Sequence, residues 1–228
     1  MGYFVTGTDT DVGKTLVSCA LLHGFAARGR RVVGMKPIAA GCGAGGVNDD
    51  VLQLRAASNV QFGIDTPGDE LVNPYAFEPA IAPHLAAQRA GVVIDTARIV
   101  VAYRELAARA EIVIVEGAGG FMVPLNDRQT GADLAQQLGL PVILVVGMRL
   151  GCINHALLTV RAIAELRLQC AGWVANVLDA DMPALQQNIE ALRERIAAPL
   201  LGVVPRMAVP DVKRAAGCLD FGLLGRGA

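Results

Sequence analysis

The sequence predicts a single α/β domain, spanning residues 1–228, with a mostly parallel sheet and helices on both faces. Short apolar runs alternate with longer helical patterns, which is typical of βαβ units. Four of the runs are almost continuously aliphatic, as strands buried on both faces require. The chain is 53% apolar and 18% charged, which fits a doubly covered sheet and further burial by self-association.

Six apolar runs are the expected strands: Tyr3–Thr6, Arg31–Lys36, Ile112–Val115, Val142–Val146, Ala171–Ala175 and Leu200–Val204. Helical patterns lie between them at Lys14–Arg28, Asp50–Ala57, an Asp95-capped segment ending at Arg109, Asp133–Leu138, Ile153–Leu166 and Pro183–Ile196. The segment Gly63–Gly91 is rich in proline and glycine, and we expect a loop with one short helix there.

Charge and cysteine content favour a cytoplasmic protein that acts on small molecules. The formal net charge is -1 and no basic stripe is present, so a nucleic-acid surface is not expected. The five cysteines are scattered without a CxxC pair, which indicates reduced thiols. Neither a signal peptide nor an apolar run of membrane-spanning length is evident, so no membrane partner is expected.

The segment after the first expected strand has the features of a phosphate-binding loop. It reads GTDTDVGKTL from Gly7 to Leu16, with Gly13, Lys14 and Thr15 opening a helix. In such loops backbone N–H groups and the helix start face the anion, the lysine reaches the β- and γ-phosphates, and the hydroxyl holds Mg²⁺. Gly7 precedes Gly13 by six positions, one more than the standard pattern. The segment therefore predicts a variant Mg-ATP loop, and a chance strand–turn–helix is the alternative.

Polar residues follow three other expected strands: Lys36, Glu116 and Asn176. Ligands of open α/β sheets bind outside the carboxyl ends of the strands, so these side chains are expected beside the loop. Each residue also has a purely structural interpretation. Lys36 could be a solvated lysine at a strand end, Glu116 could cap a turn, and Asn176 could be an ordinary turn residue. The functional hypotheses are an acid that holds Mg²⁺ for Glu116 and recognition of the adenine edge for Asn176.

A polar triplet, Asn48 to Asp50, precedes a short expected helix. Asp49 or Asp50 as the N-cap is one explanation, and a contact to Mg²⁺ or nucleotide is the other. The sequence leaves both open. The glycine-rich stretch 39–48 before the helix is suited to closing over a substrate.

Nine segments resemble the dethiobiotin synthetase family in order and spacing, over about Tyr3 to Pro205. They are GTDTDVGKT, MKPIAAG, VNPYAFEP, APH, VEGAGG, PVILVVG, LGCINHALLT, AGWVAN and PLLGVVP. The resemblance implies a P-loop NTPase fold and closure of the ureido ring of dethiobiotin from 7,8-diaminopelargonate, CO₂ or bicarbonate, and ATP, with Mg²⁺. It also implies a homodimer with the substrate site at the subunit interface.

The same resemblance assigns roles to individual residues. Lys14 and Lys36 would neutralise carbamate and γ-phosphate oxygens, and Thr10 would join them as a catalytic residue. Thr15, Asp50 and Glu116 would hold Mg²⁺. The implied nucleotide contacts are Asp11, Val12, Gly13, Lys14, Thr15, Leu16, Asp50, Glu116, Gly117, Ala118, Gly119, Asn176, Pro205, Arg206 and Met207. Ala40 is an implied substrate contact. A helix start is implied to receive the substrate carboxylate from the neighbouring subunit, and its residues are Gly151, Cys152, Ile153 and Asn154.

The chain departs from the family pattern at three places. Ala40 stands where Ser or Thr is usual, so one hydrogen bond to substrate, about 0.5–1.5 kcal/mol, is expected to be missing. Val177 replaces a common Asp after Asn176, which bears on adenine selectivity. Asp211 is the candidate for an expected acidic nucleotide contact near Val209–Val212.

Three other functions share parts of this pattern. A cobyrinic acid-type amide ligase would carry a C-terminal glutaminase domain, for which 228 residues are expected to leave no room. A partition-type ATPase switch would have a second lysine early in the loop, and Gly7–Val12 contains none. A small-molecule kinase would leave phosphate on its product.

Overall fold

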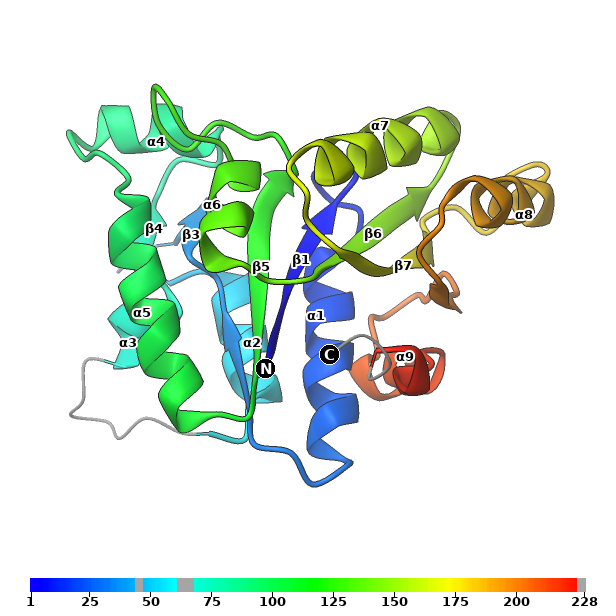
Figure 1. Cartoon of the computed structure of the whole chain (residues 1–228), viewed down its shortest axis with the longest axis horizontal. Helices are drawn as coiled ribbons and strands as arrows, with labels where there is room; N and C mark the ends of the chain where they lie inside the picture. The colour runs from blue at the N-terminus through cyan, green and yellow to red at the C-terminus, as the bar shows by residue number, and fades with distance from the viewer. Residues whose placement is uncertain (44–46, 61–67, 225–228) are drawn as a thin grey trace.

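A computed structural model describes residues 1–43, 47–60 and 68–224, and it confirms the expected α/β architecture. Six parallel strands form the main sheet in the order β2-β5-β1-β6-β7-β8 (Figure 1). In chain order these strands are β1 (Gly2–Gly7), β2 (Val32–Met35), β5 (Ile112–Gly120), β6 (Val142–Met148), β7 (Cys170–Val177) and β8 (Leu200–Val204).

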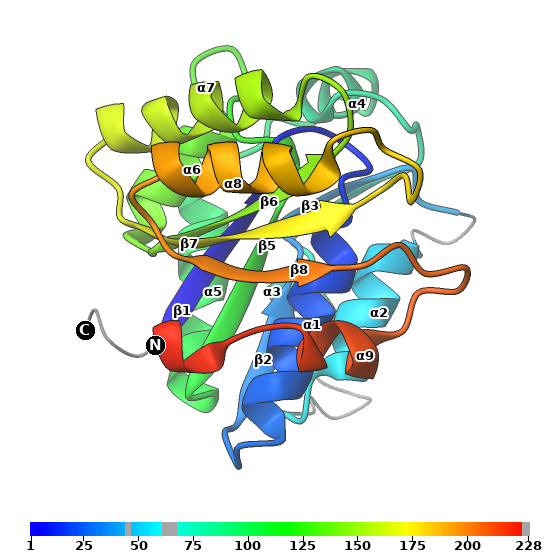
Figure 2. The ribbon, with the colours of Figure 1, turned by 90° about the vertical axis from the view of Figure 1, so that its right-hand side faces the viewer.

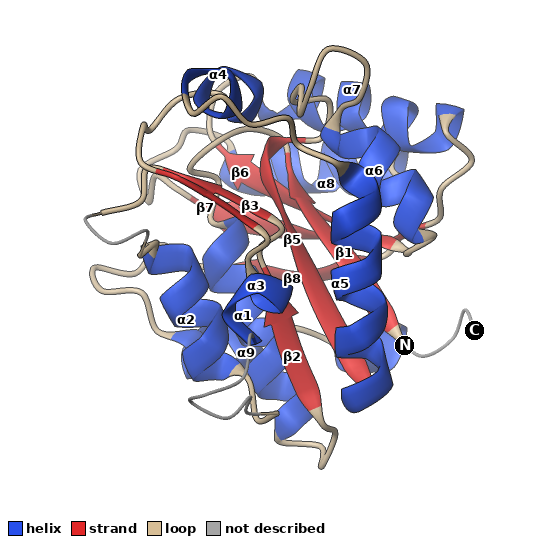
Figure 3. Ribbon diagram, turned by 90° about the vertical axis from the view of Figure 1, so that its left-hand side faces the viewer, coloured by secondary structure: helices blue, strands red, loops and turns tan. Residues whose placement is uncertain are grey.

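Helices cover both faces of this sheet. The longer ones are α1 (Lys14–Ala26), α2 (Asp49–Ala57), α5 (Thr96–Arg109), α6 (Gly131–Leu138), α7 (Cys152–Glu165) and α8 (Leu185–Arg195). The shorter ones are α3 (Gly68–Val72), α4 (Pro83–Arg89), α9 (Val212–Gly217) and the 3-10 helix η1 (Phe221–Leu223). Figure 3 shows α5 and α6 on the opposite side of the sheet from α1 and α2. Figure 2 shows α7 and α8 on the opposite side of β7 and β8 from α1 and α9.

Alternation along the buried strands divides the core between the two faces. Ile143 and Val145 of β6 join the cluster formed with α1 and α9, whereas Leu144 and Val146 join the cluster formed with α7 and α8. All seven residues of β6 are buried, as expected for a strand covered on both sides. This arrangement fixes the carboxyl ends of β1, β5 and β6 at one edge of the sheet.

The segment 63–91 is more structured than the sequence indicated. Residues 63–67 lie outside the described ranges, but the remainder holds α3, α4 and strand β4 (Tyr75–Phe77), where one short helix was predicted. Strand β4 pairs in parallel with β3 (Ile38–Ala40), which was also not predicted. Three-residue strands show too little alternation to be recognised from sequence. Asn73 connects the two regions, because its Nδ2 donates to the carbonyls of Lys36 (2.6 Å) and Tyr75 (3.0 Å).

Strand β5 and helix α6 differ from their predicted bounds for local reasons. Strand β5 continues past Val115 to Gly120, because it goes on pairing with β1 as far as Gly7. Helix α6 begins at Gly131 rather than Asp133, because Thr130 forms a capping box with the Asp133 side chain. The predicted cap of α5 is confirmed, since the Asp95 carboxylate accepts from the amide of Ala97 (2.8 Å).

The two C-terminal helical segments, α9 and η1, were not predicted and cover α1. The Phe221 ring packs edge-on against Phe25 at 5.1 Å, and the Arg28 guanidinium lies 4.1 Å from its centroid. Gly24 makes room for this ring, because a Cβ there would lie 2.0 Å from Phe221 Cζ. The C-terminal segment therefore belongs to the core of the domain.

All five thiols are unpaired, as the sequence indicated. Burial, with a smaller contribution from the negative charge of Glu116, raises the pKa of Cys19 to about 12. In residues 1–43, 47–60 and 68–224, no helix combines the length and apolar character needed to cross a bilayer.

Replacing Phe221 by alanine is expected to lower the free energy of unfolding by about 3 kcal/mol, because the change opens a cavity against α1. Urea unfolding followed by circular dichroism measures this loss. Val209→Ala is the control, since Val209 is 78% exposed and its truncation should change stability by less than about 0.5 kcal/mol. Equal stability of Phe221→Ala and the unaltered chain would contradict a core role for η1.

Candidate active site

The loop between β1 and α1 has the backbone shape of a tight anion-binding turn. Asp11 and Gly13 both adopt left-handed backbone conformations, with φ of 56° and 88°. Asn176 of β7 holds the loop through a hydrogen bond, because its Nδ2 donates to the Val12 carbonyl at 2.8 Å. A Cβ on Gly13 would lie 2.1 Å from that Nδ2 atom, so the position is restricted by both conformation and space. The structure thus confirms a strand–loop–helix unit with the extra residue accommodated in the turn.

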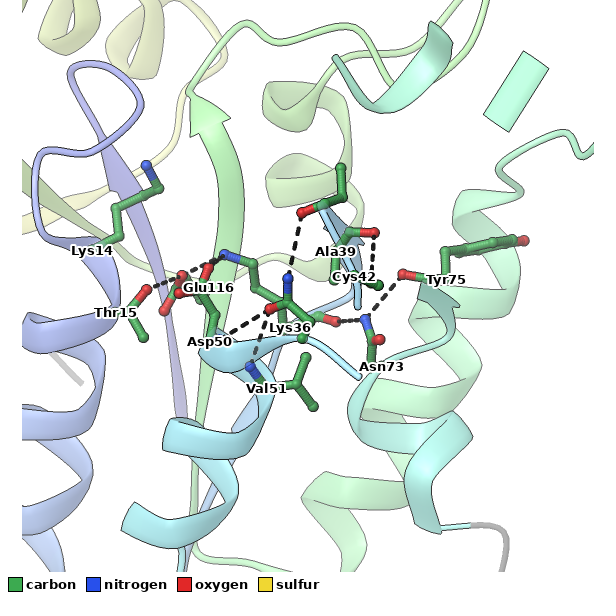
Figure 4. A network of polar contacts seen from close by, with 12 residues as sticks. Lys14, Thr15, Lys36, Ala39, Cys42, Asp50, Val51, Asn73, Tyr75 and Glu116 are labelled. Atoms are coloured by element: carbon green, nitrogen blue, oxygen red, sulfur yellow. Dashed lines mark hydrogen bonds and ion pairs between the residues drawn. The ribbon is translucent and has the colours of Figure 1, made fainter. Parts of the chain in front are cut away.

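A buried lysine between two carboxylates lies next to this loop (Figure 4). Lys36 Nζ donates to Glu116 Oε1 at 2.5 Å and to Asp50 Oδ2 at 2.8 Å. The Thr15 hydroxyl also donates to Glu116 Oε1, at 2.9 Å. Lys36 is 5% exposed and Glu116 is fully buried. Residues from four separate parts of the chain therefore converge on one charged cluster.

Local structure directs each member of this cluster inward. Lys36 follows β2, and its N–H donates to the Val72 carbonyl at 2.9 Å. Glu116 lies within β5, where the strand passes under the loop. Asp50 is free to reach Lys36 because Asn48, and not Asp49 or Asp50, caps α2: the Asn48 side chain accepts from the amides of Asp50 and Val51. The capping explanation for the acidic residues was therefore wrong.

Charge pairing outweighs burial at Lys36. Burial alone would lower the pKa of its ammonium group, but Glu116 and then Asp50 raise the pKa above the ordinary lysine value. Burial alone would likewise raise the pKa of Asp50, and the ammonium of Lys36 lowers it. Lys36 and Asp50 are therefore both charged near neutral pH.

Lys14 differs from Lys36 in its partner. It is 6% exposed, and its Nζ donates to the backbone carbonyl of Asp9 at 2.9 Å. Burial, followed by the positive charge of Lys36, lowers the pKa of Lys14. A buried ammonium held by a neutral carbonyl gains more from an incoming anion than one already paired with carboxylates.

A cavity of about 810 Å³ opens onto these groups and is large enough for a small-molecule ligand. The predicted site residues that line it are Thr10, Asp11, Gly13, Lys14, Thr15, Lys36, Ala40, Asp50, Glu116, Ala118 and Gly119. Ile38 of β3 and the residues Ala80 to Pro83, which lead into α4, also line the cavity, and the sequence did not name them as site residues. The flexible stretch predicted at 39–48 can be described only in part, since residues 44–46 lie outside the described ranges.

Other predicted residues do not line this cavity. Val12 and Leu16 pack into the core beside α1, and Gly117 packs close to the Phe4 ring. Residues Pro205, Arg206 and Met207 follow β8, whose Val204 is in register with Asn176. The start of α7, Gly151 to Asn154, lies beyond the end of β6, with Gly151 exposed and Cys152 buried.

Val177 and Asp211, at two of the positions that depart from the family pattern, have structural surroundings. The Val177 side chain is 7% exposed, and Val177 is in register with Met148. Asp211 caps α9, because its carboxylate accepts from the amide of Arg214 at 3.0 Å.

The sequence did not identify Asp9 and Arg149, which form an ion pair at the loop. They are 140 residues apart in the chain, and neither belongs to a short motif that would have indicated the pairing.

The cluster fits a Mg²⁺ ion that is shared with phosphate. Glu116 Oε2 is buried and has no hydrogen-bond partner within the described structure, so a lone pair is available next to the Thr15 hydroxyl and the Asp50 carboxylate. Groups of three or more His, Cys, Asp or Glu residues suited to a metal are absent from residues 1–43, 47–60 and 68–224. Mg²⁺ commonly takes only one or two carboxylates and completes its shell with waters and substrate phosphates.

Known proteins similar to this chain place it in a family. A family model described as an AAA domain matches residues 1–214. The chain is 54% identical to the ATP-dependent dethiobiotin synthetase of Nitrosospira multiformis over 98% of this chain and 96% of the relative. It is 55% identical to that of Aromatoleum aromaticum over 95% and 96%. The chain belongs to the ATP-dependent dethiobiotin synthetase family.

Solved structures with low sequence identity confirm the predicted P-loop NTPase fold. The cell division protein MinD of Aquifex aeolicus matches with a TM-score of 0.57 at 13% identity, covering 95% of this chain and 94% of MinD. MinD of Pyrococcus horikoshii, complexed with Mg-ADP, matches with a TM-score of 0.55 at 17% identity, covering 96% and 87%. These likenesses concern the fold, and the family assignment follows from the dethiobiotin synthetases.

Gly13→Ala is expected to weaken ATP binding at least about tenfold, equivalent to 1.4 kcal/mol, because the new Cβ displaces Asn176 and the loop. Isothermal titration with a non-hydrolysable ATP analogue measures the change. Gly139→Ala is the matched control: Gly139 also has a positive φ, 64°, but a Cβ there meets no atom within 4 Å. Unchanged ATP affinity in Gly13→Ala would contradict the assigned loop geometry.

Proposed function

We propose that this chain is the Mg-ATP-dependent ligase that closes the ureido ring of dethiobiotin from 7,8-diaminopelargonate and CO₂. The observation that carries the proposal is the junction of two buried lysines, two carboxylates and a hydroxyl at one phosphate loop. Family membership supplies the substrates, and the cavity supplies space for the diamine beside the triphosphate.

The reaction needs charge neutralisation and positioning more than covalent help from the protein. One amine of the substrate adds CO₂ to form a carbamate. A carbamate oxygen then attacks the γ-phosphorus, ADP leaves, and a carbamic–phosphoric anhydride forms. The second amine attacks the carbonyl carbon, and phosphate leaves with the bonding electrons as the ring closes.

Lys14 and Lys36 take different parts in this scheme. Lys14 exchanges its bond to the Asp9 carbonyl for oxygens of the β- and γ-phosphates. Lys36 moves from Glu116 toward the carbamate and the γ-phosphate, where it stabilises the charge that develops during transfer. Thr10, which also lines the cavity, orients the reacting groups beside the loop.

Thr15, Asp50 and Glu116 would hold Mg²⁺. When bound, the ion would neutralise phosphate charge and polarise the transferring phosphoryl group. The two carboxylates would then no longer need the ammonium of Lys36 as a counter-ion, and Lys36 would be free to contact the reactants.

The nucleotide base is proposed to bind beyond the loop, at Asn176 and the segment Pro205 to Met207. Asn176 keeps its carboxamide oxygen for the base, because its Nδ2 already donates to Val12. Val177 is buried and offers no polar contact. The amide of Asn176 thus carries most of the base selectivity.

A homodimer is proposed to complete the substrate site. Leu150 is 97% exposed just before α7, and Leu158 on the same helix is 58% exposed. Together with Asn154, Leu158 lines a groove of about 490 Å³ that also contains Arg161 and Arg195. Exposed apolar side chains of this kind are suited to burial by a second copy, whose Gly151–Asn154 helix start would bind the substrate carboxylate.

An assay with Mg-ATP, bicarbonate and 7,8-diaminopelargonate tests the proposal. Dethiobiotin and free phosphate should appear together, in equal amounts. ATP hydrolysis that ignores the diamine would favour a partition-type switch instead. A stable phosphorylated product would favour a kinase, and glutamine-dependent amide formation on a dicarboxylic substrate would favour the cobyrinic acid-type ligase.

Lys36→Met is expected to lower kcat on the order of 10²–10³-fold, because one preorganised cation facing developing charge is lost. Steady-state kinetics measure this, and urea unfolding checks that the variant is folded. Lys213→Met is the control, since Lys213 lies exposed on α9. Turnover of Lys36→Met near that of Lys213→Met would refute the role given to Lys36.

A further inference from the structure

An ion pair between Asp9 and Arg149 joins the phosphate loop to the segment after β6. Asp9 lies in the β1–α1 loop, and Arg149 directly follows β6 at the same edge of the sheet. The Asp9 carboxylate contacts Arg149 Nη2 through Oδ2. Neither side chain has a part in the chemistry proposed above.

Asp9 also holds two residues of the proposed active site. Its Oδ1 accepts from the amide of Thr10 at 2.8 Å, and its carbonyl accepts from Lys14 Nζ at 2.9 Å. Asp9 therefore contacts Thr10 through its side chain and Lys14 through its backbone carbonyl.

Arg149 is itself fixed by the start of α7. Its carbonyl accepts from the amide of Cys152 at 3.0 Å, which closes the turn between β6 and α7. The Cys152 side chain is buried, so this turn is anchored in the core. The guanidinium thus extends from a rigid base toward the phosphate loop.

Other contacts already hold the loop on the sheet. The Thr8 amide donates to the Val145 carbonyl at 3.0 Å, and Val12 is fully buried against β6, where a Cβ on Gly147 would lie 2.8 Å from it. The side chains of Arg149 and Asp9 are 43% and 47% exposed, and ion pairs that are this exposed add little to stability. The pair is therefore poorly placed to serve folding.

The ion pair affects the charge of the phosphate loop. An unpaired carboxylate at Asp9 would add a negative charge to the loop that must accept a triphosphate. We propose that Arg149 is a positioning residue that neutralises and orients Asp9, so that the phosphate loop accepts the nucleotide polyanion with Lys14 in place. The inference rests on the proposed function only in taking this loop as the nucleotide site.

Charge neutralisation makes a specific prediction for paired variants. Arg149→Met should weaken binding of Mg²⁺ with a non-hydrolysable ATP analogue by about tenfold, or 1.4 kcal/mol, because the Asp9 charge is uncovered. Adding Asp9→Asn should restore affinity to within about threefold of the unaltered chain, since asparagine keeps an oxygen for the Thr10 amide. Arg149→Lys should also bind nearly normally. The deficit of Arg149→Met should shrink at high salt, where exposed charges are screened.

Isothermal titration without diamine measures these affinities, and Arg193→Met is the matched control because its exposed ion pair with Glu190 lies on α8. In steady-state assays Arg149→Met should raise the KM for ATP and leave kcat nearly unchanged. Normal nucleotide affinity in Arg149→Met, or failure of Asp9→Asn to restore it, would overturn the proposal, as would an unaltered chain that binds no nucleotide. Nucleotide binding with the predicted variant pattern but no dethiobiotin formation would overturn the proposed function alone.

Discussion

The cluster of Lys36, Asp50 and Glu116 is the constraint on which the rest of the site depends. The Lys36 ammonium group and the Glu116 carboxylate are withdrawn from water there, whereas the Asp50 side chain is 37% exposed, and buried charges are tolerated only when they are paired. Removing one partner leaves an uncompensated buried charge, which commonly destabilises a protein by several kcal/mol. The cluster therefore requires β2, β5 and α2 to meet at one point beside the phosphate loop.

Lys14 and Lys36 lie at the same edge of the sheet but differ in the groups that hold them. Lys36 is held by carboxylates, which raise its pKa and keep it charged in a buried place. Lys14 is held only by a carbonyl, and burial lowers its pKa. An incoming triphosphate would stabilise the charged form of Lys14, and a divalent cation at the carboxylates would release Lys36. Binding of Mg²⁺ with ATP would thus replace the internal partners of both lysines with the reacting groups.

Much of the site could be predicted because its residues belong to contiguous motifs or to strand ends. Gly13, Lys14 and Thr15 occupy fixed positions relative to a strand and a helix, and the parallel sheet brings Lys36 and Glu116 to the same edge. The cap of α2 could not be assigned from the sequence, because Asn48, Asp49 and Asp50 are successive residues that all favour the capping position.

Contacts between distant or very short segments could not be predicted. Strand β3, which contributes Ile38 and Ala40 to the cavity, pairs with β4, and each strand has three residues, too few for a periodic pattern. Helix α9 and η1 depend on Phe221 meeting Phe25 across the fold. The Asp9–Arg149 pair joins loops whose proximity follows from the order of β1 and β6 in the sheet, which the sequence did not establish.

A crystal structure with Mg²⁺, 7,8-diaminopelargonate, bicarbonate and a non-hydrolysable ATP analogue tests the central claim most directly. The account predicts the triphosphate in the Gly7–Thr15 loop, Mg²⁺ at Thr15, Asp50 and Glu116, and Lys36 Nζ turned from Glu116 toward the γ-phosphate and the carbamate. A nucleotide bound elsewhere, or Lys36 still paired with both carboxylates beside a bound triphosphate, would contradict it.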